Sequence, residues 1–212
     1  MSAVAEAPGA LAEAAPSVLG PEHNGIVMTP EEFDAVEDWD PKHRYELLHG
    51  LLVVSPPPPA AERSPNGELD YWLRSYRDHH PEGHRLDDTL SEQVVKIGKQ
   101  RRRADRAIWV GLGRLPDPDN DPPTIAVEFV SPGRRSFRRD YEEKRADYAS
   151  VKVREYWVID RFRRTMTVFR RAGRGWRQSV VQEGEIYRTD LLPGFELPLG
   201  KLLAIADRYA GK

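Results

Sequence analysis

Two carboxylates stand inside stretches that otherwise read as buried β-strands. Asp105 lies at the head of the apolar run in RRRADRAIWV, and Glu128 lies in the middle of IAVEFV, which prolines precede and Pro-Gly soon follows. A charge in an apolar strand is costly unless its face is solvated, paired or bound to a metal. If the two strands are neighbours, both carboxylates can meet at one edge of the sheet. Their oxygens then form a site of the kind that Mg²⁺ or Mn²⁺ prefers.

Such a site could hydrolyse a phosphodiester bond. A divalent metal polarises the phosphoryl oxygen and lowers the pKa of an attacking water molecule. The spacing alone leaves a second interpretation open, in which Glu128 belongs to an edge strand with one solvated face. The surrounding elements must decide between the two.

The pattern of apolar residues predicts an α/β domain with a mixed sheet. A helix begins after Thr29, with Pro30 in its first turn and Glu32 placed for a capping box. Further helices are predicted at 66–80, 138–150 and the C-terminal end, and strands on both sides of Gly50 and at 91–98, 102–111, 125–131, 154–160 and 165–181. The chain contains no glycine-rich phosphate loop.

Length and composition indicate one globular domain with a tail. The first 25 residues are rich in Ala, Pro and Gly and predict a disordered segment, which leaves 26–212 as the folded domain. The chain has no cysteine, which excludes disulfides and thiolate chemistry. It has no apolar run of membrane-spanning length and no signal peptide, so we expect a cytoplasmic protein with no membrane partner.

The net charge of −2 conceals an asymmetry along the chain. Residues 1–95 carry 6 Lys and Arg against 18 Asp and Glu, whereas residues 96–177 carry 22 against 11. A basic centre is compatible with a polyanionic partner. The same arginines also fit an ordinary solvated surface, so charge by itself does not identify a partner.

Several segments, in their order and spacing, resemble a known family. They are MTPEEFDAV, RYELLHGLLVVSPPP, RRADRAIWV, PTIAVEFVSP, RRDYEEKRADYASVKVREYWVID and LPGFELPL. Together they resemble the restriction-endonuclease-like nucleases of PD-(D/E)XK type, in particular the Uma-two-type restriction endonucleases. The resemblance runs from about Met28 to Leu203 and implies a restriction-endonuclease-like mixed β-sheet flanked by helices.

The resemblance also implies a function and a set of site residues. It implies a Mg²⁺-dependent endonuclease that acts on DNA, in which Asp105 and Glu128 match the metal-binding pair. Glu46, in RYELLHG, would be a third acid close to the metal, and the backbone carbonyl of Phe129 would complete the coordination. Because one such site cuts one strand, double-strand cleavage would need a homodimer.

The lysine of this resemblance stands in an unusual place. The superfamily has a lysine two residues after the glutamate, where this chain has Val130. The family resembled places a lysine on the following helix, in an Asp-x-x-x-Lys-x-x-x-Tyr run that Asp140, Lys144 and Tyr148 match. This spacing puts all three on one helical face, where Lys144 could stabilise the charge on a phosphate. The alternative is a surface ion pair between Asp140 and Lys144.

Other positions depart from the family pattern without removing a metal ligand. Ala104 replaces the proline before the aspartate, Lys152 replaces a glycine, and the histidine expected after the proline-rich turn is missing. These departures keep a second function open. The chain could be a catalytically inactive domain that retains the nuclease fold and binds nucleic acid or a protein.

Overall fold

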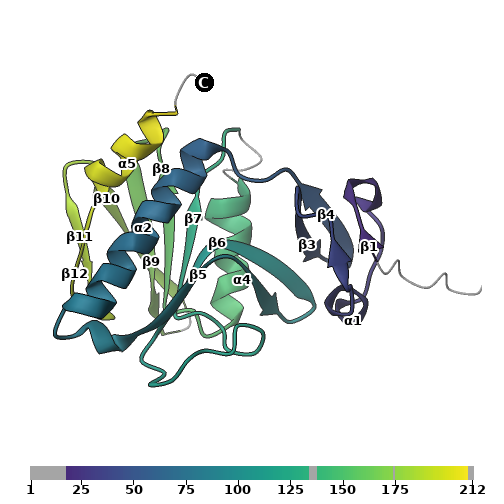
Figure 1. The fold of residues 1–212 in the computed structure, drawn as a ribbon, viewed down its shortest axis with the longest axis horizontal. Coiled ribbons are helices and arrows are strands. Elements are labelled where there is room, and N and C mark those ends of the chain that lie inside the picture. The colour runs from purple at the N-terminus through teal and green to yellow at the C-terminus, as the bar shows by residue number, and fades with distance from the viewer. Residues whose placement is uncertain (1–17, 134–137, 174, 210–212) are drawn as a thin grey trace, which may run out of the picture.

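The computed structural model describes residues 18–133, 138–173 and 175–209 (Figure 1). The strands are β1 Val18–Leu19, β2 Asp38–Trp39, β3 Arg44–Leu48, β4 Leu51–Ser55, β5 Leu86–Ile97, β6 Gln100–Val110, β7 Ile125–Phe129, β8 Glu155–Asp160, β9 Thr165–Ala172, β10 Gly175–Gln182, β11 Ile186–Thr189 and β12 Leu192–Pro198. The α-helices are α1 Pro30–Asp34, α2 Ala60–His79, α4 Lys144–Ser150 and α5 Leu199–Asp207. Short 3₁₀ helices are η1 Pro21–His23 and η2 Gly83–Arg85, and η3 Arg139–Glu143 is a π-helical segment.

The central sheet has the strand order β10-β9-β8-β7-β6-β3-β4, and β5 also pairs with β6. Strands β7 and β8 run parallel, while the other pairs in this sheet are antiparallel. Helices α2 and α5 cover one face and α4 lies on the other (Figure 1). The prediction of an α/β fold with a mixed sheet between helices is therefore confirmed.

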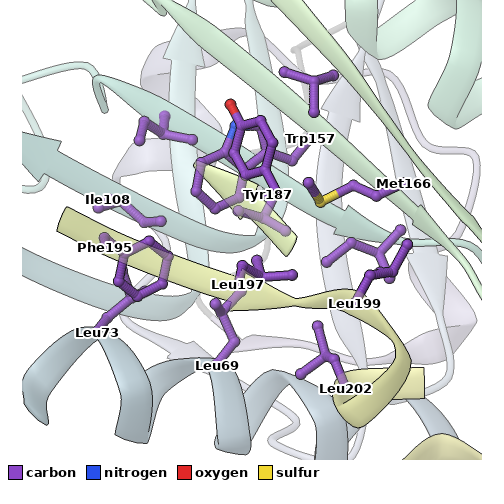
Figure 2. Close-up of a cluster of buried hydrophobic side chains, with 14 of the residues drawn as sticks. Leu69, Leu73, Ile108, Trp157, Met166, Tyr187, Phe195, Leu197, Leu199 and Leu202 are labelled. Carbon is purple, nitrogen blue, oxygen red and sulfur yellow. The ribbon is translucent and has the colours of Figure 1, made fainter. Parts of the chain in front are cut away.

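The main core lies between the sheet and the pair α2 and α5. Figure 2 shows leucines of both helices against the β12 strand and the side chains of Ile108, Trp157 and Met166. Burial of this apolar surface is the main force that fixes the helices on the sheet. A second cluster, around Tyr148 and Tyr156, fills the face that α4 covers. In the described part of the chain, no helix is long and apolar enough to cross a membrane.

Helix α2 begins earlier than the sequence pattern predicts. It starts at Ala60 and includes Pro65, whereas the predicted helix covered only 66–80. Proline lacks the N–H that would bond to the residue four positions earlier, so Pro65 removes one hydrogen bond near the start of the helix. The packing of Leu69, Leu73 and Tyr76 into the core offsets that loss. Helix α1, in contrast, starts as predicted, with the Thr29 and Glu32 capping box.

The predicted disordered tail is too long. Residues 18–25 are structured, because β1 pairs in parallel with β2 and Leu19 is fully buried. Leu19 packs in an apolar cluster with Phe33 and Tyr45, and its carbonyl accepts a hydrogen bond from the Tyr45 hydroxyl at 3.1 Å. The short apolar stretch around Leu19 was enough to anchor this segment. The first 17 residues of the predicted tail lie outside the described residues.

Strand β6 has one partner strand on one side and two on the other. One side of β6 pairs with β5 over nearly its whole length. The other side pairs with β3 at Arg101 and with β7 from Arg106 to Ile108, so that residues 102–105 pair with no strand there in the described structure. We call residues 102–105, with the diverging strands β3 and β7, the sheet fork. Side chains replace the missing strand: Glu46 accepts from the Arg103 N–H at 2.9 Å, and Lys144 donates to the Arg103 carbonyl at 2.8 Å.

Candidate active site

Asp105 and Glu128 lie across from each other at the sheet fork. The register pairs Arg106 with Val127, and the next residues of the two antiparallel strands are Asp105 and Glu128. The expectation that their strands are neighbours is correct. The expectation of a sheet edge is wrong, because β7 lies between β6 and β8 and its five residues are buried. A solvated edge strand therefore does not explain Glu128, whose residue is 1% exposed.

Glu128 is held by two donors from the helix that follows. Its Oε2 accepts from Lys144 Nζ at 2.7 Å, and its Oε1 accepts from the Tyr148 hydroxyl at 3.1 Å. The two donors are four residues apart and therefore lie on the same side of α4. The alternative of a surface ion pair between Asp140 and Lys144 is wrong. Lys144 is buried against Glu128, and the buried Asp140 pairs with Arg139 at 3.0 Å.

The surroundings of Glu128 disfavour its charged form. Burial raises the pKa of Glu128, Lys144 opposes that rise, and the charges of Asp105 and Asp140 add to it. Burial also raises the pKa of Asp140. Several carboxylates thus crowd around one lysine, and a divalent cation would relieve their mutual repulsion.

Asp105 is fixed by groups on both flanking strands. Its Oδ2 accepts from the backbone N–H of Phe129 at 2.7 Å, and its Oδ1 accepts from Nη2 of Arg44. Arg44 also pairs with Glu92 at 2.7 Å. Burial alone would raise the pKa of Asp105, but Arg44, Lys144 and the Phe129 N–H outweigh it and hold the pKa below its usual value. Asp105 is therefore an ionised, buried ligand candidate.

Glu46 reaches the fork from β3. It is 6% exposed, and its carboxylate accepts from the backbone N–H of Arg103. Burial opposes its ionisation, but Lys144, the Arg103 N–H and Arg102 lower its pKa below the usual value. The structure thus places Glu46 at the same fork as Asp105 and Glu128, with the main chain of β6 as its direct hydrogen-bond partner.

The donor set fits a hard divalent cation. The N–H and C=O of one strand residue point to the same side, so the Phe129 carbonyl lies on the side of Asp105, which its N–H contacts. Mg²⁺ uses one or two protein carboxylates and keeps several waters. Two carboxylates and one carbonyl suit that habit. No group of three or more His, Cys, Asp or Glu side chains is arranged to hold a metal ion within the described ranges.

Glu62 is a buried acid that the sequence patterns did not single out. It lies in the first turn of α2, is 3% exposed, and accepts a hydrogen bond from Ser131 Oγ at 3.0 Å. Its Oε1 has no hydrogen-bond partner in the described structure. Burial, followed by the charge of Asp105, raises the pKa of Glu62 to about 7. The signal was hidden because the predicted helix began after this residue.

A groove of about 510 Å³ opens beside the fork. Its lining includes Arg44 and Glu92, which also contact each other, and Arg103 of β6. Arg44 lines this groove and pairs with Asp105, so its side chain stands between the groove and the buried carboxylates. The candidate site thus has a buried acidic cluster with an arginine-lined groove beside it.

Comparison with known proteins agrees with this fold. The chain is similar in structure to "a putative nuclease belonging to DUF820 from Anabaena variabilis", with a TM-score of 0.67 and 14% sequence identity over 84% of this chain and 99% of that one. At this identity the likeness establishes a nuclease-like fold. The family model of Uma2, described as "Putative restriction endonuclease", matches residues 30–200. The chain belongs to the Uma2 family. No curated protein matches it.

Proposed function

We propose that this protein is a Mg²⁺- or Mn²⁺-dependent endonuclease that hydrolyses phosphodiester bonds in DNA. Membership of a restriction endonuclease family supports a nuclease. The observation that carries the finer proposal is the meeting of Asp105 and Glu128 at the sheet fork, with Lys144 hydrogen-bonded to Glu128. Buried carboxylates beside a lysine, next to an arginine-lined groove, suit hydrolysis of a phosphate ester.

Each residue has a separate role in this proposal. Asp105, Glu128 and the Phe129 carbonyl would hold the cation, which supplies Lewis acidity toward the phosphoryl oxygen and toward a water. Lys144 would donate a hydrogen bond to the phosphate, whose negative charge grows in the transition state. Glu46 would act as a positioning residue, because it fixes the main chain of β6 two residues from Asp105.

Lys144 supplies the amine that this chain lacks at the superfamily's usual lysine position. Val130, two residues after Glu128, is 4% exposed and packs in the cluster beneath α4. A lysine there would have to enter that apolar cluster. Lys144 reaches Glu128 from the helix and keeps its ammonium group between a carboxylate and the Arg103 carbonyl.

DNA as the substrate brings a further expectation. A single site of this kind cuts one strand, so cleavage of both strands requires a homodimer with a two-fold axis. Sedimentation that shows only monomers at micromolar concentration, with and without DNA, would contradict the homodimer. A cytoplasmic location stays a prediction from the sequence.

One observation favours a second function. Arg44 and Lys144 already neutralise Asp105 and Glu128 through direct ion pairs. A fully paired cluster could serve stability alone, in a catalytically inactive domain that binds nucleic acid or a protein. The crowding of Asp105, Glu128 and Asp140 around the one ammonium group of Lys144 argues against this alternative, because a cluster built only for stability would not gather like charges.

The test is plasmid cleavage by the wild type and by Asp105→Asn. We expect nicking or linearisation with Mg²⁺ or Mn²⁺, none with EDTA, and a rate at least about 100-fold lower in the variant, because it loses a ligand. Asp88→Asn is the control: Asp88 is a partly buried carboxylate on β5 that, like Asp105, forms ion pairs with arginine, here with Arg74 at 3.5 Å and Arg77 at 3.7 Å. The proposal is wrong if purified wild type does not cleave, or if folded Asp105→Asn cleaves as fast as wild type.

A further inference from the structure

The groove beside the fork is lined by more basic than acidic side chains. Four arginines line it, namely Arg44, Arg63, Arg103 and Arg106, against the two carboxylates of Asp70 and Glu92. Arg44 and Arg106 are held in ion pairs with acids of the protein. The groove as a whole therefore carries an excess of positive charge. Arg44, which lines it, pairs with the buried Asp105.

Two of these arginines retain unused donors. Arg103 donates through Nη1 to the Glu92 carbonyl at 2.8 Å, but its buried Nε has no partner in the described structure. Arg63 is exposed in the first turn of α2, and its guanidinium has no hydrogen-bond or ion-pair partner among the described residues. An arginine fork with free donors is well suited to the oxygens of a phosphate group.

Gly67 adds an observation of a different kind. It lies in the interior of α2, where glycine is less favourable than alanine, and it lines the same groove. A Cβ atom at this position would meet nothing within 4 Å, so packing against the protein does not require the glycine. Arg63 and Gly67 are four residues apart and share one face of the helix. The groove wall thus presents an unpaired guanidinium next to an exposed position without a side chain, where a charged side chain can be introduced without a clash inside the protein.

We propose that this groove binds the sugar-phosphate backbone of the DNA strand on one side of the scissile bond. One phosphate binds Arg63, and the strand crosses α2 at Gly67 before it reaches Arg44 and the buried carboxylates. Arg103 of β6 lines the same groove. This assignment rests on the proposed function, and it adds which wall of the site the substrate follows.

Gly67 permits a test that alters the charge of the groove in both directions. The probe is a fluorescein-labelled DNA duplex, and the dissociation constant is measured by anisotropy in EDTA, where cleavage does not interfere. We expect Gly67→Glu to weaken binding about 10-fold or more and Gly67→Lys to strengthen it several-fold. Gly67→Ala, which shares the gain in helix propensity, controls for a change in stability and should leave the constant within about 2-fold.

Arg63→Gln supplies the complementary loss of charge. We expect binding to weaken about 5- to 10-fold and the slope of log K against log salt to fall by about 0.9, the value for one lost phosphate contact. Arg77→Gln is the matched control, since it removes the same charge from the far end of the same helix, outside the groove. It should leave both quantities unchanged.

The outcomes separate the groove from the catalytic proposal. Equal affinities for Gly67→Glu and Gly67→Lys, or equal losses for Arg63→Gln and Arg77→Gln, would overturn the groove assignment even if the plasmid is cleaved. A groove that responds to charge as expected would stand even if the plasmid experiment fails, because the anisotropy measurement needs no cleavage.

Discussion

Glu128 and Glu155 are both buried glutamates, and they lie on the neighbouring parallel strands β7 and β8, yet their surroundings differ sharply. Glu155 accepts hydrogen bonds from four side chains, which are Trp157 at 2.9 Å, Tyr187 at 2.7 Å, Thr189 at 2.8 Å and Arg170 at 3.1 Å. Among the described residues, Glu128 accepts hydrogen bonds from only Lys144 and Tyr148. It also has two further acids, Asp105 and Asp140, in its electrostatic surroundings.

The difference distinguishes a carboxylate whose acceptor sites are all used within the protein from one that can still bind a ligand. A carboxylate has about four lone-pair sites, and the side-chain donors around Glu155 occupy them all. Glu155 thereby ties β8 to the β11–β12 hairpin. Glu128 retains acceptor capacity and sits where negative charge is already in excess, which is the condition that favours a cation.

The largest effect on stability is expected at Glu155. Glu155→Ala leaves Arg170 without its carboxylate and three buried donors without an acceptor. We expect the free energy of unfolding to fall by about 3–5 kcal/mol, because each buried donor left without an acceptor costs about 1–3 kcal/mol. Urea unfolding measures this change. A loss below about 1 kcal/mol would mean that the four contacts contribute little, and the contrast with Glu128 would disappear.

Glu128→Gln should strongly lower metal affinity and change stability little. We expect Mn²⁺ affinity to fall about 100-fold, or about 2.7 kcal/mol, because the variant loses a charged ligand. The free energy of unfolding should change by no more than about 1 kcal/mol. The amide keeps an oxygen near Lys144, other carboxylates still compensate that lysine, and the repulsion from Asp105 is relieved.

Titration calorimetry with Mn²⁺ and thermal melts test both parts of this prediction. Unaltered Mn²⁺ affinity would remove Glu128 from the metal site. A stability loss as large as that of Glu155→Ala would instead make the Glu128–Lys144 pair a structural ion pair.

The smallest expected effect concerns pH. A carboxyl whose pKa is higher in the folded protein than in the unfolded chain holds its proton more tightly when folded, so stability falls as pH rises between the two values. For Glu62 this window runs from the ordinary glutamate pKa of 4.5 to the folded-state pKa of about 7. We expect the metal-free protein to lose about 1–2 kcal/mol across this window from Glu62, after allowance for solvent screening.

Glu62→Gln should flatten this part of the stability curve, because the amide does not titrate. Unfolding in urea at a series of pH values, with EDTA present, measures the slope. An identical slope in the wild type and Glu62→Gln would show that Glu62 titrates normally in the folded protein.

The local parts of the site could be predicted from the sequence. The apolar runs around Asp105 and Glu128 indicated two strands, and the four-residue spacing of Lys144 and Tyr148 put both on one side of a helix. That the two strands pair was only a condition of the predicted site, and the structure meets it. These inferences succeed because side-chain direction in strands and helices follows short periods. The capping box of Thr29 and Glu32 was predictable for the same reason.

The remainder depends on contacts between distant parts of the chain. Nothing near Arg103 in the sequence indicates that β6 pairs with two different strands on one side. The burial of Leu19 requires a partner strand some twenty residues later, and Glu62 is recognisable as a buried acid only once α2 is seen to begin at Ala60. Pairing of this kind is decided by tertiary packing, which single-residue patterns do not encode.

The sheet fork also divides the molecule into parts that can open separately. Strand β3 joins β6 at one residue pair, Leu47 with Arg101, and the segment from β1 to β4 has its own apolar cluster. A unit with so little main-chain pairing to the rest of the sheet is expected to exchange its amide hydrogens through local opening, at a lower free energy than the central strands. Since Arg44 and Glu46 both belong to β3, one opening event would withdraw both from the carboxylates together. The rate at which this β1–β4 unit opens would then limit how long the site stays assembled.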